Sequence, residues 1–393
     1  MTIAKLDRPA NGGWKHDDPL TAYTLPSRYF YDPALFEAEK RTIFYRCWHM
    51  AGHVSELAGR GQYVTVDVFE QSVIVVRGHD DVVRAFHNVC QHRGHRLVKE
   101  RRGTLAAVLT CPYHAWAYGL TGDLRNAPRT EGVRGFDKGE FGLKPVRLEL
   151  FAGFWYVNLD PDAKAMADTM PGAEAEIRRF VPDLDSMTLV HEKDYHVAAN
   201  WKVVVDNAIE GYHFPLSGTY HRELTDLIDY DRWDPQAHGA WWVFKGPPRP
   251  GNTHAYGAAI GNAPYQTDWF FNLNLWPYNT VYAFPYADFL GTFLMMPAGP
   301  ETALVRCGYY RPDRPEPALT KAAMAWFGDK LAVEDIELNV GVQQGLRSFG
   351  YDQGRYVIDP ARPNIGENLV HHFHSLVYEA VHGEGREASP RRT

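Results

Sequence analysis

The sequence predicts an α+β protein with two domains: a small antiparallel β domain, and a second domain in which one antiparallel sheet is wrapped against helices. Two observations support this prediction. The chain has 393 residues, which is long enough for two separate hydrophobic cores. Short alternating or β-branched runs between turn residues fill its first half, whereas a row of aromatic strands in its second half has helical patterns at both ends.

The chain begins with an arm and a helix, over residues 1–45. Residues 1 to about 25 are rich in Pro, Gly, Asp and Lys, a composition typical of a surface arm. Apolar residues at helical spacing then predict a helix from about Pro33 to Tyr45. We expect this helix to pack on the second domain.

Residues 46–160 are predicted to form the small β domain. Gln62–Val68 alternates between polar and apolar residues, and Ser72–Arg77 is a β-branched run, so both are predicted to be strands. Turn residues recur between such runs, which favours antiparallel pairing. Residues 161–186 are predicted to be a linker with one helical segment, from Pro171 to Phe180.

Residues 187–382 are predicted to form the second domain. It starts with the strand Thr188–Glu192, and a helical pattern follows from Trp201 to Tyr212. A long helix from about Ala318 to Arg347 closes the domain. Residues 383–393 are polar, and we expect them to form a loose tail. Three strands rich in aromatic residues are predicted between these helices, at Trp241–Phe244, Asp268–Trp276 and Asn279–Met296.

Charge and hydropathy exclude several kinds of partner. The formal net charge of -7 argues against nucleic acid. No apolar run reaches membrane-spanning length, and the start of the chain is no signal peptide, so we expect no membrane partner and a cytoplasmic location. Cys47 and Cys307 stand alone beside aromatic or apolar neighbours, which predicts buried free thiols rather than a disulfide.

The other two cysteines belong to two short blocks, C-Q-H and C-P-Y-H. Each block carries one Cys and one His, whereas a zinc finger usually pairs Cys with Cys and His with His. The alternating order lets Cys90 and Cys111 hold one iron while His92 and His114 hold a second one, which is the ligand set of a Rieske [2Fe-2S] centre. The alternative is a structural zinc site with the same four ligands.

The residues around these blocks carry a resemblance to a known family. The string C-x-H-R-G…C-P-Y-H-x-W-x-Y is similar to the Rieske signature in the large subunit of Rieske non-haem iron oxygenases. The resemblance extends from about Tyr29 to Gly354. It implies a Rieske domain over residues 46–160, a helix-grip-like catalytic domain over residues 187–382, and a homotrimer, with a trimer of trimers or a hexamer as the alternative. The chain has no G-x-G-x-x-G fingerprint, so electrons are expected from a separate reductase or ferredoxin.

A second metal site is indicated by the histidines after Trp201. Two His and one carboxylate form the ligand set of a non-haem Fe(II) oxygenase, although such a His pair is more often structural. The string N-W-K-x-x-x-D-N-x-x-E-x-Y-H is similar to the family's catalytic helix, which implies that His213 is an iron ligand. In the family the second His follows five residues later. Here that position is Gly218, which cannot bind a metal through a side chain. His221 is the nearest candidate, and an added short loop would bring it back to the iron.

The carboxylate is expected on the long closing helix. A carboxylate on an apolar helix face is costly unless it is paired or binds a metal, which singles out Asp335, whereas Glu334 and Glu337 are predicted to point away. The alternatives are a surface acid and an acid paired with a buried Arg. The string E-D-x-x-L resembles the family segment that supplies this ligand, which implies Asp335. The predicted apolar face consists of Leu331, Asp335, Leu338, Val342 and Leu346.

Two acids before His213 are catalytic candidates. Glu210 stands three residues earlier and therefore on the same helical face. The resemblance implies that Glu210 links His213 to His114 of a neighbouring subunit, and the alternative is support of His213 within one chain. Asp206, one turn earlier, is expected near the iron.

The substrate is suggested by the many aromatic residues between Trp241 and Tyr286. Most of them are expected in the core, and the others suit either a flat arene or a quaternary ammonium. The motifs resemble the betaine and carnitine branch of the family. This implies hydroxylation of an N-methyl group, of proline betaine, glycine betaine or a similar compound, with loss of formaldehyde. The alternatives are a dioxygenase or monooxygenase for an aromatic acid, a pure electron-transfer protein, and a binding protein without iron.

The sequence around the first block, His92–Arg102, is strongly basic. It is interpreted either as a solvated loop or as a docking surface for an acidic electron donor.

Overall fold

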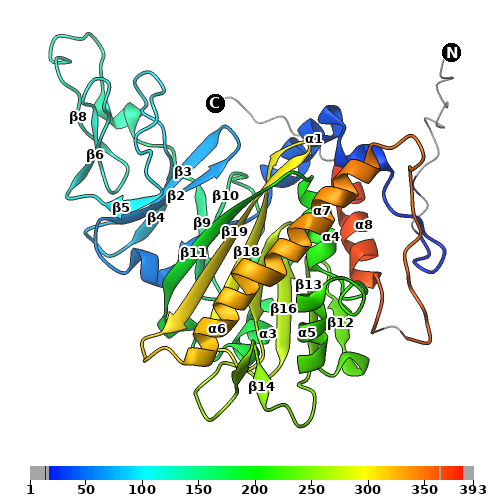
Figure 1. The fold of residues 1–393 in the computed structure, drawn as a ribbon. Coiled ribbons are helices and arrows are strands. Elements are labelled where there is room, and N and C mark those ends of the chain that lie inside the picture. The colour runs from blue at the N-terminus through cyan, green and yellow to red at the C-terminus, as the bar shows by residue number, and fades with distance from the viewer. Residues whose placement is uncertain (1–13, 15–16, 363, 384–393) are drawn as a thin grey trace, which may run out of the picture.

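The computed structural model describes residue 14 and residues 17–362 and 364–383. Most of the arm expected over residues 1–25 lies outside the described residues, and so does nearly all of the tail expected over residues 383–393. The described chain forms a small β domain, which extends to one side of a larger domain built from a sheet and helices (Figure 1). This agrees with the predicted α+β class.

The small domain consists of three antiparallel sheets. Its central sheet has the order β4-β3-β2-β5, and Val73, Ile74 and Val75 of β3 are fully buried, as expected for a β-branched run. The two metal-ligand blocks lie in the β4–β5 and β6–β7 connections. The strands are β1 (His49–His53), β2 (Gln62–Val68), β3 (Gln71–Arg77), β4 (Val83–His87), β5 (Arg102–Thr104), β6 (Val108–Thr110), β7 (Ala117–Gly119), β8 (Leu124–Asn126), β9 (Arg147–Phe151) and β10 (Phe154–Asn158).

The large domain is organised by one seven-stranded antiparallel sheet of order β11-β19-β18-β17-β16-β13-β12. The run predicted as a single strand after Asn279 is split by a turn into β17 and β18. The strands are β11 (Met187–Val197), β12 (Asp234–Ala237), β13 (Trp241–Gly246), β16 (Phe270–Leu275), β17 (Asn279–Ala283), β18 (Leu290–Gly299) and β19 (Thr302–Pro312), with a separate hairpin of β14 (His254–Ala255) and β15 (Ala258–Ala259).

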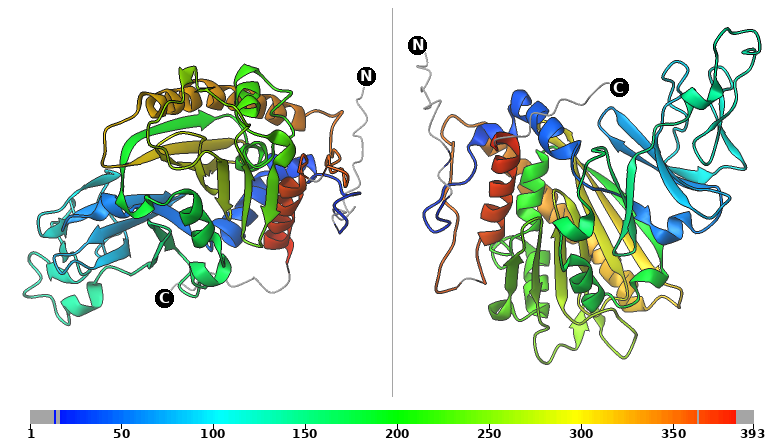
Figure 2. Two further views of the ribbon diagram at one scale, coloured as in Figure 1. Left: turned by 90° about the horizontal axis from the view of Figure 1, so that it is seen from below. Right: turned by 180° about the vertical axis from the view of Figure 1, so that it is seen from behind.

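Five helices (α4–α8) cover one face of this sheet, and α3 packs on the other face (Figures 1 and 2). The α-helices are α1 (Pro33–Glu39), α2 (Met166–Thr169), α3 (Ala173–Phe180), α4 (Trp201–Ala208), α5 (Thr219–Leu227), α6 (Ala318–Trp326), α7 (Ala332–Leu346) and α8 (Asn368–His382). Two π-helical segments, η2 (Lys40–Phe44) and η7 (Phe327–Leu331), and five 3₁₀ turns, η1 (Ser27–Phe30), η3 (Val54–Leu57), η4 (Lys138–Phe141), η5 (Leu184–Ser186) and η6 (Tyr230–Arg232), complete the described elements.

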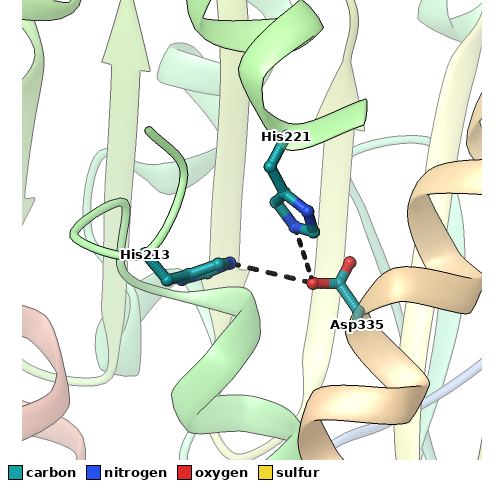
Figure 3. A group of neighbouring side chains, drawn as sticks. All are labelled: His213, His221 and Asp335. Carbon is teal, nitrogen blue, oxygen red and sulfur yellow. Dashed lines mark hydrogen bonds and ion pairs between the residues drawn. The ribbon is translucent and has the colours of Figure 1, made fainter. Parts of the chain in front are cut away.

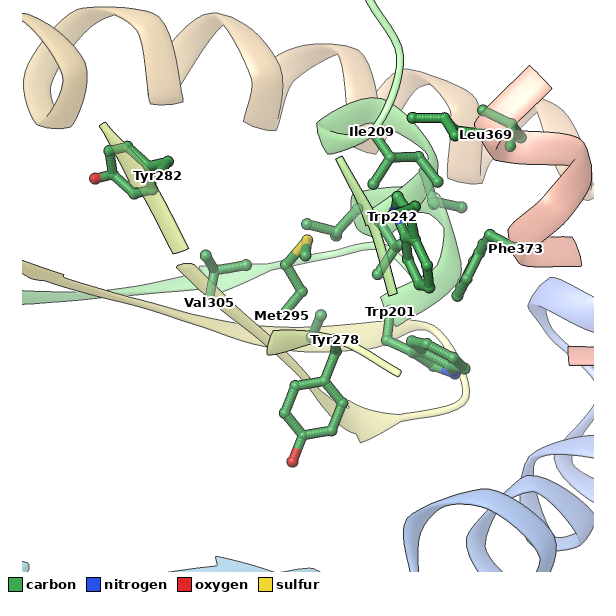
Figure 4. Packing of buried hydrophobic residues seen from close by; sticks show 14 of the residues in the cluster. Trp201, Ile209, Trp242, Tyr278, Tyr282, Met295, Val305, Leu369 and Phe373 are labelled. Carbon is green, nitrogen blue, oxygen red and sulfur yellow. The ribbon is translucent and has the colours of Figure 1, made fainter. Parts of the chain in front are cut away.

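Alternation along the strands divides the core into two layers. On the helix side, Trp242 of β13 packs against Phe373 of α8 with ring centroids 5.9 Å apart, and Trp201 of α4 lies 5.5 Å from the same ring (Figure 4). On the other side, Trp241 and Val243 join the cluster that contains the inner residues of β10 and α3. The sheet is therefore buried on both faces, which explains its density of aromatic residues.

Three of the α-helices were not predicted from the sequence. No helix was expected over residues 166–169, 219–227 or 368–382, which form α2, α5 and α8. The long closing helix is present, with the π-helical segment η7 inserted between α6 and α7. A π-helical segment inside a helix often marks a functional site, and η7 ends four residues before Asp335.

Arginines of the small domain form an ion-pair cluster with the large domain. Arg101 and Arg102 both contact Glu192 of β11, and Arg102 also contacts Glu56. These two arginines are therefore engaged inside the chain, so this part of the basic sequence His92–Arg102 is no free docking surface for an electron donor.

No helix within the described ranges is long and apolar enough to cross a membrane. All four cysteines are free and buried, as expected for Cys47 and Cys307.

Candidate metal centres

The two Cys/His blocks lie in two loops of the same shape. In each loop an amide four residues after the Cys donates back to the Cys carbonyl, Gly94 N to Cys90 O and Ala115 N to Cys111 O, both at 3.0 Å. Gly94 and Ala115 both have positive φ angles, of 71° and 54°, which turn the chain sharply after each His. The loops thereby present two matching sets of ligands toward each other.

The four side chains of these loops fit a Rieske cluster. The rings of His92 and His114 lie side by side, with centroids 4.7 Å apart, and both thiols are buried. His114 Nδ1 is buried without a hydrogen-bond partner among the described residues, which is what a ligand atom requires before its metal binds. Cys90 Sγ lies 3.2 Å from the Tyr118 hydroxyl, a hydrogen bond of the kind that tunes cluster sulfurs.

His213, His221 and Asp335 form the second cluster (Figure 3). One ligand atom from each lies within 4.8 Å of the others. His221 Nε2 is 2.9 Å and His213 Nε2 is 3.7 Å from Asp335 Oδ1, and His213 Nε2 is buried with no hydrogen-bond partner. Two imidazoles and one carboxylate on one side of a cavity fit a non-haem Fe(II) with open positions opposite them.

Each histidine of this cluster has a second carboxylate behind it. The Nδ1 of His213 contacts Glu210, and the Nδ1 of His221 lies 2.9 Å from Glu334 Oε2. Both Nε2 atoms are thereby left for a metal, which is the usual carboxylate–histidine–metal arrangement. The prediction that Glu334 points away from the site is wrong, because this carboxylate faces His221.

Glu334 also explains why His221 stands on a helix. Its carboxylate accepts hydrogen bonds from the backbone amides of Thr219, at 2.8 Å, and Tyr220, at 3.1 Å, which open the first turn of α5. Gly218 has a φ of +66°, and a Cβ there would stand 2.3 Å from Glu334 Cδ. The glycine that occupies the family's usual ligand position therefore makes room for the residue that holds His221.

The helix face around Asp335 is more polar than the sequence predicted. Leu338 and Val342, expected on this face, are 39% and 52% exposed. The buried residues at successive turns after Asp335 are Asn339 and Gln343. Gln343 accepts a hydrogen bond from Asn200 N at 2.8 Å, so this polar face positions the start of α4. A pattern of apolar residues in the sequence could not predict this buried polar face of the helix.

The ionisation of the cluster suits a cation. Burial raises the pKa of Asp335, but its two imidazole neighbours outweigh burial and lower the pKa to about 2. Burial lowers the pKa of His213, but interactions with Asp335 and Glu210 outweigh it and raise the pKa to about 9. A metal that binds here displaces protons from the imidazoles and takes over their interaction with Asp335.

Asp206 does not join this cluster. Its Oδ2 lies 3.0 Å from His374 Nε2, and the other ring nitrogen of His374 lies 2.7 Å from the Tyr356 hydroxyl. Asp206 Oδ1 is buried without a partner. The acid therefore connects α4 to α8, and we propose a supporting rather than a ligand role for it.

A cavity with about 60 Å³ of free space adjoins this site, and His221 and Asp335 belong to its lining. Seven Phe and Tyr residues make up half of the lining residues. None of the described residues that line it is Lys or Arg. The aromatic lining residues are Phe214, Phe244, Phe270, Tyr282, Phe284, Phe293 and Phe327.

The two metal centres lie at different ends of the chain's fold. The cluster loops are at the tip of the small domain, whereas α4, α5 and α7 carry the second cluster in the large domain (Figures 1 and 2). Electron tunnelling weakens steeply with distance, so the two centres of one chain are poorly placed to exchange electrons directly.

The sequence matches two protein families. Residues 184–383 match the ring hydroxylating alpha subunit (catalytic domain), and residues 47–137 match the Rieske [2Fe-2S] domain. The carnitine monooxygenase oxygenase subunit of Escherichia coli (strain K12) is 36% identical over 361 residues, which cover 92% of this chain and 94% of that protein. The glycine betaine monooxygenase oxygenase subunit of Chromohalobacter salexigens is 36% identical over 241 residues, covering 57% of this chain and 53% of that protein.

Solved structures agree with these matches. A quaternary ammonium Rieske monooxygenase in complex with its substrate L-carnitine has a TM-score of 0.83 at 31% identity, covering 93% of this chain and 97% of that chain. Naphthalene 1,2-dioxygenase from Rhodococcus sp. has a TM-score of 0.76 at 20% identity, covering 93% and 95%, which shows a common fold. The chain therefore belongs to the Rieske oxygenases, oxidoreductases whose two domains hold a Rieske [2Fe-2S] cluster and a mononuclear iron.

Proposed function

We propose that this protein is the terminal oxygenase component of a Rieske monooxygenase that hydroxylates an N-methyl group of a quaternary ammonium compound, such as glycine betaine or proline betaine. One atom of O₂ enters the methyl group and the other leaves as water, with two electrons from a separate reductase or ferredoxin and two protons. The hydroxymethyl group then leaves as formaldehyde, so the net reaction is an oxidative N-demethylation.

The aromatic wall of the cavity carries this proposal. Aromatic faces attract a quaternary ammonium through cation–π contacts worth about 0.5–2 kcal/mol each. Because no Lys or Arg stands among the described lining residues, no positive side chain repels such a guest. The relatives named for carnitine and glycine betaine support the same substrate class.

We assign the ligands as follows. Cys90, His92, Cys111 and His114 hold the [2Fe-2S] cluster, and His213, His221 and Asp335 hold Fe(II). When bound, the cluster relays single electrons and the mononuclear iron supplies the O₂ chemistry. Glu210 and Glu334 hold the two imidazoles in the orientation that points each Nε2 at the iron.

We further propose that electrons cross between subunits of a homotrimer. The cluster loops and the iron ligands lie far apart in one chain (Figure 1), and a cyclic head-to-tail assembly brings each small domain to the next subunit's large domain. Glu210 then joins His213 to His114 of the neighbouring subunit. One solved relative is a quaternary ammonium Rieske monooxygenase whose structure gives insights into inter-subunit electron transfer. The free, buried thiols of Cys47 and Cys307 support a cytoplasmic location.

The substrate class is tested by product analysis with the intact holoenzyme, a reductase and O₂. We expect glycine betaine, proline betaine or another N-methyl quaternary ammonium to release about one formaldehyde per O₂ consumed. Benzoate and related aromatic acids serve as the comparison. A cis-diol or phenol from an aromatic acid, with no formaldehyde from any ammonium compound, would assign the protein to the ring-hydroxylating alternative.

A further inference from the structure

The hydroxyl of Tyr282 is buried beside the hydroxyl of Tyr309, and neither has a further hydrogen-bond partner among the described residues. Tyr282 is only 3% exposed, and its ring packs between Phe284 and Phe327, with centroids 5.3 and 5.1 Å away. The neighbouring strand leaves room for this ring because residue 291 is glycine. A Cβ at Gly291 would stand 2.0 Å from Tyr282 Cζ. Two buried hydroxyls that pair only with each other leave one of their two hydrogens without an acceptor, which destabilises a fold, so a phenylalanine would serve better here if packing were the only role.

Tyr282 belongs to the same cavity as the iron ligands. It lines that cavity together with His221 and Asp335. It stands on β17 beneath the long α6–α7 helix (Figure 4), and its neighbour Phe327 precedes Asp335 on this helix by about two turns. A small guest whose methyl group faces the metal therefore has its other end within reach of Tyr282.

A second polar side chain lies beside Tyr282 on the next strand. Asn272 pairs directly with Tyr282 across β16 and β17, so the two side chains stand on one face, and Asn272 also lines the cavity. Asn272 Oδ1 accepts a hydrogen bond from Asn274 Nδ2 at 2.8 Å, which leaves the amide N–H groups of Asn272 for a guest. Burial raises the pKa of Tyr282 well above its ordinary value, so its hydroxyl stays protonated and can donate.

We propose that Tyr282 and Asn272 form the specificity-determining end of the cavity, where they donate hydrogen bonds to an oxygen that the substrate carries away from its ammonium group. This inference rests on the proposed function. The donors are neutral, and no Lys or Arg joins them among the described lining residues. A carboxylate oxygen and a hydroxyl oxygen both satisfy this arrangement, whereas a purely hydrocarbon ammonium does not.

The test compares ligands with and without such an oxygen. γ-Butyrobetaine, choline and tetramethylammonium are titrated calorimetrically into anaerobic holoenzyme, where no turnover occurs. For Tyr282→Phe we expect about 3–10-fold weaker binding of the oxygen-bearing ligand that the wild type prefers, and unchanged binding of tetramethylammonium. The matched control is Tyr156→Phe, which removes another buried unpaired hydroxyl, on β10 and outside the cavity, and should change none of the affinities.

The outcomes distinguish a failure of the role given to Tyr282 from a failure of the proposed N-demethylation. A larger loss for γ-butyrobetaine than for choline identifies a carboxylate as the recognised group, and the reverse identifies a hydroxyl. Equal weakening of all three ligands, or no change in any, overturns the role of Tyr282 while formaldehyde release by the wild type leaves the proposed function intact. A wild type that binds none of them and releases no formaldehyde from any ammonium overturns both.

Discussion

Gly218 leaves room for a carboxylate that serves two purposes. Glu334 occupies the space that a side chain at this position would fill, and there it caps α5 and holds His221. The geometry of one proposed iron ligand thus depends on the absence of a side chain three residues before it. Because the φ of Gly218 is +66°, any other residue also adds backbone strain.

Gly218→Ala is expected to displace Glu334 and, with it, His221. We expect about one iron of three per chain to be lost, with an unchanged Rieske spectrum, because the cluster loops are in the other domain. Iron analysis and EPR of the purified protein measure this. Gly341→Ala, on the exposed side of α7 with open space around it, is the control and should keep all the iron. Full iron content in Gly218→Ala would contradict the role given to Glu334.

At the scale of elements, a buried ion pair joins the end of α1 to the start of α4. Lys202 and Glu39 are both fully buried, with Nζ and Oε1 2.6 Å apart, and Glu39 also accepts a hydrogen bond from Trp201 Nε1 at 2.9 Å. Burial lowers the pKa of Lys202 even though Glu39 opposes this shift. The pair fixes the beginning of the helix that leads to His213.

Lys202→Met is expected to lower the free energy of unfolding by about 3–5 kcal/mol, because Glu39 would remain buried without its partner. The double variant Lys202→Met/Glu39→Gln should recover most of this loss, since glutamine can still accept from Trp201 and carries no charge. Urea unfolding followed by circular dichroism measures both. Arg60→Met, which breaks an exposed pair with Asp81, should leave the stability nearly unchanged. Equal losses in the single and double variants would refute this account.

Local patterns predicted some elements well and others not at all. The strands around Val64 and Ile74 follow from alternation and β-branching, and the Cys/His blocks follow from spacing alone. Helix α5 could not be predicted, because its cap comes from Glu334, 115 residues from Thr219 in the chain. Leu338 was assigned to a buried face that in fact carries Asn339, because long-range hydrogen bonding rather than hydrophobicity buries that face. The roles of the nine proposed site residues remain predictions.

At the scale of the whole molecule, the two proposed metal centres are separated within each chain (Figure 1). Glu210 contacts His213 inside the chain, and His114 is half-buried in its own domain. If electrons cross between subunits, the cluster and the iron of one active unit belong to different chains.

Mixed trimers test this directly. Asp335→Ala chains keep the cluster but lose the iron, and Cys111→Ser chains keep the iron but lose the cluster, so each variant alone should be inactive. Co-expressed in equal amounts, they should regain about a quarter of wild-type formaldehyde release, because one in four directed contacts then joins an intact cluster to an intact iron site. Glu210→Gln in the iron-bearing chain should abolish this recovery. Mixed trimers without activity would show that electrons stay within one chain.

The long-range cap on α5 also sets the order in which the protein can mature. The first turn of α5 lacks its acceptor until α7 has been synthesised and has docked on the sheet, since Glu334 lies more than a hundred residues later in the chain. His221 and Asp335 then meet for the first time, so iron can enter only a nearly finished fold. On the ribosome, the cluster ligands emerge early and the mononuclear site is completed last. We therefore expect nascent chains that end before α7 to accept a cluster but no third iron.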